Sequence, residues 1–527
     1  MEQNSATGNE KKEPVWQPEI DELNLRKSFA EQMGGPAGVE RQHKSGKLTC
    51  RERIDNLFDP NSFREIGELN GKAEYDENGK LIKVSPSSMV IGKGLIDGKK
   101  VVVAAEDFTV KAGSSEQASP EKMIFAERLA LDHLMPMVRL VDAVGGSIRL
   151  LEKNQSTKIP GYDGWNINLG LVPIVAVALG PCAGLGAMRV VASHFSVMVK
   201  DISQVFAAGP QVVAPGTHET VTKEDLGGVQ IHTKESGMVD NRADSEQDAF
   251  EQVRRFLSYL PPNVYEAPKR QDTEDSPDRR EEALASIIPK NRRLPYKSRK
   301  ILELVFDKGS LFEIGKDHGS SQITMLGRIN GYPVGILAND PMIMGGSMTH
   351  TASEKIIRFV DMCDTFHLPV VNFFDQPGVA VGRNAESHST LRMAVRAGMA
   401  ISQATVPWCT FFIRRAFGVA GAIYEPRSRA TIRYAWPSAY WGSIPIEGGV
   451  EAAYKRDILS APDPLARRNE LVEYYKRFET PFRTAEKFLM ENIIDPRDTR
   501  EILCDWIEEA YAQMPRLVGV KTRTMRI

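Results

Sequence analysis

The chain repeats itself at a nearly constant spacing of 233 residues. The recurring pairs are Gly94 and Gly327, Ile96 and Ile329, Gly98 and Gly331, Val101 and Val334, Ala105 and Ala338, and Asp107 and Asp340. The same spacing links Glu121 and Lys122 to Glu354 and Lys355 and Pro136 to Pro369, and a spacing of 234 links Pro173 to Pro407 and Gly184 to Gly418. A spacing held over so many segments predicts two tandem copies of one domain.

The repeat divides the 527 residues into four parts. We expect a flexible N-terminus over residues 1–20, a first domain over 21–265, a charged linker over 266–295 and a second domain over 296–527. Residues 266–295 are dense in charge and proline, which is typical of a surface linker. The polar first 20 residues have no apolar core, so a secretory signal is not expected.

Strand and helix signals alternate within each copy. Residues 98–105 are typical of a turn and a β-branched strand, Ser119 and Pro120 of a helix start, and residues 137–141 of another strand. In the second copy, Thr351 and Glu354 are spaced as a capping box before a strand over residues 368–374. Alternating strands and helices predict an α/β fold with a mostly parallel sheet wrapped by helices.

An uncharged stretch over residues 169–188 matches a bilayer in length, but prolines and glycines interrupt it. We interpret residues 172–179 as a strand buried on both faces and expect no membrane segment. The five cysteines show no C-x₂-C spacing, so a zinc ribbon is not expected, and few scattered thiols favour a reducing, cytoplasmic compartment. A net charge of -2 argues against nucleic acid as the main partner.

Common catalytic motifs are missing from the sequence. The nine histidines show no H-E-x-x-H spacing, and both G-x-S-x-G and the P-loop signature are absent. We therefore expect no metal site and no P-loop ATPase. Residues 43–53 form a basic cluster, which is either a solvated helix face or a docking site for phosphates or an acidic partner.

Glycine-rich turns follow the predicted strands in both copies. They lie at residues 142–147 and 180–186 in the first copy and at 375–378 and 416–421 in the second. Glycine lets a ligand approach the backbone closely, and free N–H groups at such a turn can hold an oxyanion without an ionisable side chain. The alternative is that these glycines only permit tight turns between strand and helix.

The chain resembles the carboxyltransferase (β) subunits of biotin-dependent acyl-CoA carboxylases, such as the propionyl-CoA and methylcrotonyl-CoA enzymes. The resemblance extends from about residue 20 to the C-terminus. It rests on residues 43–54, 106–110, 180–184, 222–228, 402–407, 415–418, 434–437 and 494–500. It implies a pair of crotonase-like domains, in agreement with the internal repeat.

The resemblance also implies a reaction. Carboxybiotin on another polypeptide gives up CO₂ beside a bound acyl-CoA, the biotin ureido group takes a proton from the acyl α-carbon, and the thioester enolate attacks CO₂. Two backbone oxyanion holes, one per copy, stabilise the negative charge, and loss of one such donor costs roughly 3–4 kcal/mol. The partners implied are a biotin carboxylase and a biotin carrier subunit, since this chain shows no biotin attachment motif.

Carried over by position, the resemblance assigns the site residues. Gly145 and Gly146 form the first hole, and Val419 and Ala420 form the second, with Gly421 as a neighbour that could replace one of them. The substrate-binding residues are Ser147, Arg149, Cys182, Ala183, Gly184 and Ala422, and the cofactor-binding residues are Gly378 and Gly418. Members of the family pair the first copy of one subunit with the second copy of its neighbour, often within a hexamer.

Several departures from the family pattern leave alternatives open. The turn at Val144 carries an apparent extra residue, Val419 adds bulk and disfavours a positive φ, and Ala422 stands where propionyl-CoA-type enzymes often have an aspartate. The reaction could therefore run in reverse, as in a decarboxylase, or the chain could be a structural subunit. A crotonase-like hydratase or isomerase is a further alternative. The substrate stays open, and a mitochondrial location is possible in a eukaryote, although no transit peptide is seen.

Overall fold

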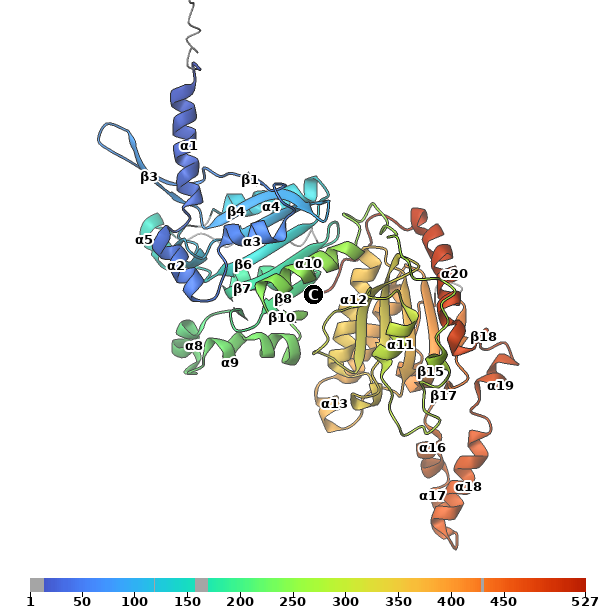
Figure 1. The fold of residues 1–527 in the computed structure, drawn as a ribbon. Coiled ribbons are helices and arrows are strands. Elements are labelled where there is room, and N and C mark those ends of the chain that lie inside the picture. The colour runs from blue at the N-terminus through green and yellow to red at the C-terminus, as the bar shows by residue number, and fades with distance from the viewer. Residues whose placement is uncertain (1–13, 118, 157–168, 428–430) are drawn as a thin grey trace, which may run out of the picture.

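Two sheets of the same design make up the molecule (Figure 1). The structure, a computed structural model, describes residues 14–117, 119–156, 169–427 and 431–527. Within these residues each sheet has eight strands. The first has the order β1-β4-β5-β6-β7-β8-β10 with β9 beside β7, and the second has the order β11-β12-β13-β14-β15-β16-β18 with β17 beside β15. The two orders correspond strand by strand, which confirms a tandem duplication of one α/β domain.

The strands have the following bounds. The first sheet contains β1 (Arg64–Ile66), β4 (Met89–Ile96), β5 (Lys99–Glu106), β6 (Met137–Ala143), β7 (Ile174–Ala183), β8 (Phe195–Val199), β9 (Gln204–Phe206) and β10 (Asn241–Ala243). The second contains β11 (Phe312–Glu313), β12 (Gln322–Ile329), β13 (Tyr332–Asn339), β14 (Val370–Gln376), β15 (Trp408–Phe417), β16 (Arg433–Ala435), β17 (Tyr440–Gly442) and β18 (Asn492–Ile493). A separate hairpin joins β2 (Gly71–Tyr75) to β3 (Leu81–Pro86).

Each domain begins its main sheet with a tight hairpin. Asp97 and Gly98 connect β4 to β5, and Asn330 and Gly331 connect β12 to β13, all four with positive φ. Asp-Gly and Asn-Gly are the pairs that a two-residue hairpin turn favours. From β5 and β13 onward the pairing is parallel, so the carboxyl ends of β6 and β7, and of β14 and β15, lie at one edge of each sheet.

Helices cover both sheets. In the first domain they are α1 (Gln17–Glu31), α2 (Pro36–Lys44), α3 (Cys50–Leu57), α4 (Pro120–Asp132), α5 (Arg149–Asn154), α7 (Leu185–Val191), α8 (Pro210–Thr217), α9 (Lys223–Gly227) and α10 (Glu246–Tyr259). In the second they are α11 (Ser298–Val305), α12 (His350–Thr365), α13 (Arg383–Ser387), α14 (Thr390–Gln403), α15 (Gly418–Gly421), α16 (Ile446–Ala453), α17 (Lys455–Ser460), α18 (Pro464–Lys476), α19 (Pro481–Ala485) and α20 (Thr499–Ala512).

The local predictions hold for most elements and fail at one helix start. The uncharged stretch forms β7, as expected, and no helix among the described residues is long and apolar enough to cross a membrane. Helix α4 begins at Pro120, as Ser119 and Pro120 indicated. The capping box at Thr351 is wrong. Thr349 caps α12 instead, because its backbone is extended and its hydroxyl accepts the amide N–H of Ala352 at 3.0 Å.

At the N-terminal end, residues 17–20 are the first turn of α1, while residues 1–13 lie outside the described part, so a flexible N-terminus stays a prediction. One interpretation needs correction. The basic cluster over residues 43–53 is not simply a solvated helix face, because Lys47 and Arg53 are buried. Both side chains form ion pairs with buried acids of the domain core. These two cations are therefore neither part of a solvated helix face nor available to bind phosphates or an acidic partner.

The two domains adjoin (Figure 1), and one cluster of buried hydrophobic residues contains side chains from both. Phe195 stacks on Phe256 of α10 with ring centroids 4.8 Å apart and meets Phe312 of the second domain edge-on at 5.4 Å. Between the domains, residues 266–295 contain the short 3₁₀ turn Glu282–Ala285, and they are mostly exposed. The exact domain boundaries stay predictions.

Candidate active site

The first element of the site is the turn that follows β6, which recurs after β14. Gly145 has φ +86, and its counterpart Gly378 has φ +134. The carbonyl of Gly145 accepts the N–H of Ser115 at 3.0 Å, and the carbonyl of Gly378 accepts the N–H of Met348 at 3.0 Å. Both turns are thus pinned on one side by the same backbone contact, 233 residues apart.

In each turn, one backbone amide takes part in this contact with the neighbouring segment, and the amide before it does not. The N–H groups of Ser147 and Ala380 are used, at 2.9 Å to Ser115 Oγ and 3.0 Å to the carbonyl of Met348. Neighbouring amides of an extended chain point to opposite sides, so those of Gly146 and Val379 point away from this contact. Among the described residues, neither of these two amides has a hydrogen-bond acceptor.

The second element is the turn between β7 and α7, which recurs between β15 and α15. Gly184 and Gly418 adopt φ +57 and +61 at equivalent positions. The next residues are Leu185, which begins α7, and Val419, which is the second residue of α15. The amides of a helix's first turn have no acceptor within the helix. Val419 itself does not have a positive φ, because Gly418 takes that conformation, and its side chain is 60% exposed. Its bulk therefore leaves the backbone of the turn undisturbed.

The two elements adjoin in each domain. In the first, Ala143 pairs with Cys182, and a Cβ built on Gly145 would lie 2.9 Å from the carbonyl oxygen of Ala183. In the second, the corresponding pair is Gln376 and Ala416. Each domain thus brings together free amides from two turns, which is the arrangement that an oxyanion hole requires.

A buried aspartate braces each turn from behind. Asp142, next to the end of β6, accepts Lys47 Nζ at 2.7 and 2.9 Å, Arg53 Nη1 at 2.8 Å and Gln42 Nε2 at 3.2 Å. Burial lowers the pKa of Lys47, which the charge of Asp142 opposes. The carboxylate is therefore committed to its partners and is not available as a base.

Asp375 has the same place in the second domain with different partners. Its carboxylate accepts the Tyr296 hydroxyl at 2.8 Å and, from Arg415, the backbone N–H at 3.0 Å, Nε at 2.6 Å and Nη2 at 2.9 Å. Burial, with the nearby charge of Asp375, raises the pKa of Tyr296 well above its usual value. Burial and the bond to Asp375 act in opposite directions on Arg415, and its pKa rises overall.

The structure separates the side chains that the sequence grouped together as substrate-binding. Cys182 is fully buried, and its Sγ contacts the carbonyl oxygens of Val141 and Gly180 at 3.3 and 3.4 Å. Burial raises its pKa well above the usual range. Ala183 is buried as well and contributes its carbonyl to the packing of the turn.

The remaining predicted residues lie at or near the two turns. Ser147 Oγ donates to Glu116 at 2.6 Å, and Arg149 begins α5. Ala422 is exposed at the end of α15. Gly421 is a packing glycine, because a Cβ there would lie 2.7 Å from the carbonyl carbon of Ala416. Ala420 is buried just before it.

Sequence reasoning missed Leu185 and Val379. A backbone amide leaves no mark on residue type, so neither position stands out on its own. The repeat carries the missing signal, since Leu185 corresponds to Val419 and Val379 to Gly146. It also missed a cavity of about 890 Å³ beside the first turn, whose walls include Arg41, Lys72, Lys83, Lys111 and Ala112. The carbonyl of Ala112 accepts the N–H of Val144 at 3.2 Å, so this cavity adjoins the turn directly.

A duplicated α/β fold with amide turns at equivalent strand ends defines a class of enzymes that stabilise oxyanions with backbone groups. Comparison with known proteins identifies the family. Residues 41–524 match the family model described as the carboxyl transferase domain. The chain belongs to the carboxyltransferase family, and it is a carboxyltransferase subunit of the kind found in biotin-dependent acyl-CoA carboxylases.

Two relatives and one solved structure show how far the similarity extends. A propionyl-CoA carboxylase carboxyltransferase subunit of Haloferax mediterranei is 35% identical over 92% of this chain and 94% of its own length. A methylmalonyl-CoA decarboxylase subunit alpha of Veillonella parvula is 34% identical over the same shares. The hexameric transcarboxylase 12S, solved with methylmalonyl-coenzyme A and methylmalonic acid bound, matches with a TM-score of 0.85 and 31% identity, over 98% of this chain and 99% of that one.

Proposed function

We propose that this chain transfers a carboxyl group between biotin, carried on a separate polypeptide, and the α-carbon or a vinylogous carbon of an acyl-CoA. The observation that carries the proposal is the pair of free amides at equivalent turns of both domains. One domain can hold the thioester oxygen and the other the ureido oxygen of biotin. Both oxygens gain negative charge in the reaction, so the two holes match the chemistry of both substrates.

The first domain is suited to the thioester. The amides of Gly146 and Leu185 would donate to the thioester oxygen, and both bonds would strengthen as the enolate forms. Biotin, when bound, supplies the carboxyl group and the base that removes the proton. The chain's task is then to hold both reactants in line, which agrees with Asp142 and Asp375 being locked in buried contacts.

The cavity beside the first turn is suited to the coenzyme A portion. Its basic residues, Arg41, Lys72, Lys83 and Lys111, would attract phosphate groups. The cavity lies next to the first turn, because Ala112 lines the cavity and its carbonyl accepts the N–H of Val144 in the turn. A thioester could therefore reach Gly146 with its phosphates among these cations.

The complete site requires a second copy of the chain. The helices that follow the two turns, α5 and α13, lie in different domains and well apart (Figure 1). We propose that the first domain of one subunit faces the second domain of its neighbour, within a hexamer built from dimers. The match to the hexameric transcarboxylase 12S over nearly the whole chain supports this assembly.

The direction of transfer has two candidates. The similarity to a decarboxylase subunit is nearly equal to that to a carboxylase subunit, at 34% and 35% identity. The same amides serve both directions, because both pass through the same enolate. We propose that the partner subunits set the direction of transfer and that this chain acts mainly in carboxylation of the acyl-CoA. A purely structural role is disfavoured, since both amide pairs are present.

The reverse half-reaction tests the proposal without a partner. The purified chain is given free biotin with malonyl-CoA or methylmalonyl-CoA, and the decarboxylated acyl-CoA is measured by mass spectrometry. Gly146→Pro and Val379→Pro each remove one N–H, and we expect each to lower kcat by about 10²–10³-fold. Val381→Pro is the matched control, because Val381 is 89% exposed two residues beyond Val379. Undiminished turnover in both hole variants would refute the amide mechanism.

A further inference from the structure

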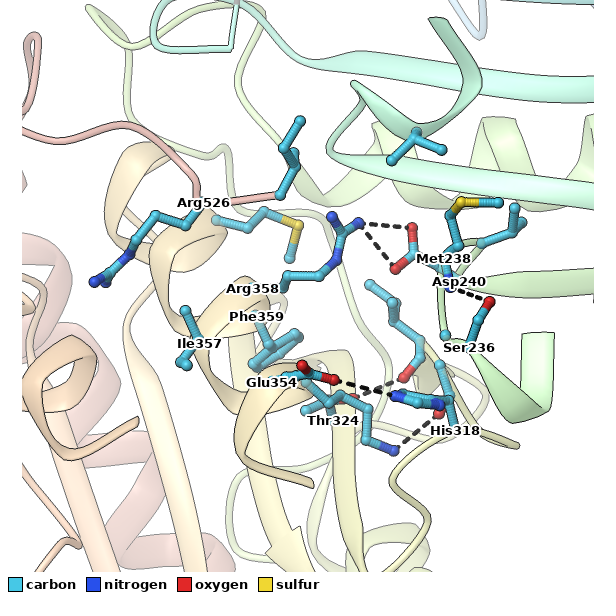
Figure 2. Close-up of a pocket in the computed structure, with 18 of the residues that line it drawn as sticks. Ser236, Met238, Asp240, His318, Thr324, Glu354, Ile357, Arg358, Phe359 and Arg526 are labelled. Atoms are coloured by element: carbon cyan, nitrogen blue, oxygen red, sulfur yellow. Dashed lines mark hydrogen bonds and ion pairs between the residues drawn. The ribbon is translucent and has the colours of Figure 1, made fainter. Parts of the chain in front are cut away.

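A second cavity lies at the junction of the two domains (Figure 2). It has a volume of about 350 Å³. Ser236, Met238 and Asp240 of the first domain line one side, while His318 and helix α12 of the second domain line the other. None of the turn residues of the active site lines it. This cavity is therefore separate from the carboxyl-transfer site.

Most charges around this cavity are already neutralised. Arg358 spans the junction and donates to both oxygens of Asp240 at 3.1 Å. His318 Nε2 lies 3.8 Å from Glu354, and both pairs are visible in Figure 2. The Arg358–Asp240 pair joins the two domains, whereas the His318–Glu354 pair lies within the second. The Arg358–Asp240 pair also shows that the junction is a packed interface rather than an open gap.

Two cations of the lining have no ion pair among the described residues: Arg396, which is exposed, and Lys355, which is buried. Lys355 is 7% exposed, and its Nζ donates to the carbonyl of Gly315 at 2.8 Å. An ammonium group has three donors. Among the described residues, no carboxylate lies within ion-pair distance of this Nζ. Burial without a paired acid lowers the pKa of Lys355 to about 7.

The internal repeat shows that this lack of a partner is specific to the second domain. The counterpart of Lys355 is Lys122, which lies 3.9 Å from Glu65. The acid equivalent to Glu65 is Glu313, and an arginine holds each of them: Arg51 lies 2.9 Å from Glu65, and Arg299 lies 2.6 and 2.9 Å from Glu313. Among the described residues, no ion pair joins Glu313 to Lys355. Lys122 thus has a carboxylate in reach where Lys355 faces a cavity.

The rest of the lining is apolar and rich in sulfur. Met238, Met362 and Met393 contribute to the walls, together with Phe359 and Ile357. Methionine side chains are unbranched and adaptable, so they accommodate alkyl groups of differing shape. The cavity therefore offers one buried cation without an ion pair, Lys355, beside an apolar surface.

We propose that this cavity binds a short-chain carboxylate, with its charged end on Lys355 and its alkyl end against the methionines. The carboxylate would supply the acid that Glu65 supplies to Lys122 in the first domain. Because both domains line the cavity, the bound molecule would contact both and stabilise their junction. The site goes beyond the proposed function, since it is apart from both amide turns.

Calorimetric titration of the full-length protein with sodium hexanoate tests the proposal. We expect saturable binding of one hexanoate per chain, and at least tenfold weaker binding of hexan-1-ol, which has the same tail without the charge. Lys355→Met should lower the affinity for hexanoate at least tenfold. Lys122→Met, the matched variant in the first domain, should leave it unchanged. Equal binding of the acid and the alcohol, or full affinity in Lys355→Met, overturns the proposal.

Two further measurements keep the outcome clear. Met393→Trp fills the cavity and retains Lys355, so it should abolish hexanoate binding even if Lys355→Met fails to fold. Unchanged affinity in Met393→Trp contradicts the location. Repeating the titration with saturating malonyl-CoA separates this cavity from the active site. Displacement of hexanoate by the thioester would place the binding at the carboxyl-transfer site and overturn the proposal, whatever the turnover assay shows.

Discussion

Replacing Asp142 with asparagine removes the negative charge that holds two buried cations behind the first amide turn. The side chain of Asp142 is 0% exposed, and those of Lys47 and Arg53 are 6% and 1% exposed. Arg53 keeps Glu246 at 2.7 Å, but Lys47 has no other carboxylate in ion-pair distance among the described residues. Breaking a buried pair from one side costs about 3–5 kcal/mol, because an uncompensated charge is left behind.

The second domain supplies the matched control. Asp375 has the equivalent position, but its cationic partner Arg415 is 17% exposed and its other partner is the neutral Tyr296. Water can reach part of the Arg415 side chain once the charge is lost. Asp375→Asn should therefore cost less, about 1.5–3 kcal/mol, which is the range for hydrogen bonds to charged groups.

Hydrogen exchange measured peptide by peptide is the appropriate assay, because a chain of two domains does not unfold as a single unit. In Asp142→Asn, amides of β6 should exchange at least a hundredfold faster, since each factor of ten corresponds to about 1.4 kcal/mol. Amides of β14 should not change. Adding Lys47→Met should restore much of the protection, because it removes the stranded cation. Acceleration below tenfold, or no rescue by Lys47→Met, would refute the reasoning.

Three other predictions follow from single sites. Gly184 has φ +57 and ψ -116, a region of the backbone that only glycine adopts readily. Gly184→Ala should therefore lower turnover and reduce the free energy of unfolding, measured by heat or denaturant, by about 1–3 kcal/mol. The control is Gly448→Ala, in helix α16 with open space around it, which should not destabilise the protein. Burial lowers the pKa of His194 to about 4, and the hydrogen bonds of its ring to the backbone of Leu169 and Ile174 oppose this only in part. The folded form binds this proton less readily than the unfolded form, so the contribution of neutral His194 to the free energy of unfolding is complete above pH 6.5 and is lost as the pH falls toward 4. His194→Gln should therefore flatten the dependence of stability on pH between 6.5 and 4. Burial raises the pKa of Cys504 to about 11, so iodoacetamide at pH 7.5 should leave it unlabelled in intact-mass spectra unless the protein is unfolded.

The duplicated fold could be predicted from the sequence because its signals are local and repeated. The hairpin residues Asp97-Gly98 and Asn330-Gly331 mark the same turn twice, and the strand after Pro136 has its counterpart after Pro369. The glycine turns were also predictable, since positive φ at Gly145 requires glycine. In each case the residue type itself records the backbone conformation.

The supports of the site could not be predicted in the same way. Lys47 and Asp142 are separated by 95 residues, and nothing near Lys47 distinguishes a buried cation from a surface one. The turn motif around Cys182 predicts a site residue, but alternation along β7 directs its side chain into the core. Leu185 offers only its amide, which every residue except proline has. Long-range pairing and side-chain direction therefore had to come from the structure.

The two amide turns have equivalent backbone conformations but different surrounding side chains. This difference is expected when the donors are main-chain amides. Because the donors are main-chain groups, substitutions around a turn leave the donors in place as long as the turn is braced. The brace is a lysine and an arginine on Asp142 in one domain, and a tyrosine and an arginine on Asp375 in the other. In the proposed function, each copy could thus change its surface after duplication toward a different oxyanion, one on a thioester and one on a urea. A site that relied on a catalytic side chain would have tolerated far less divergence.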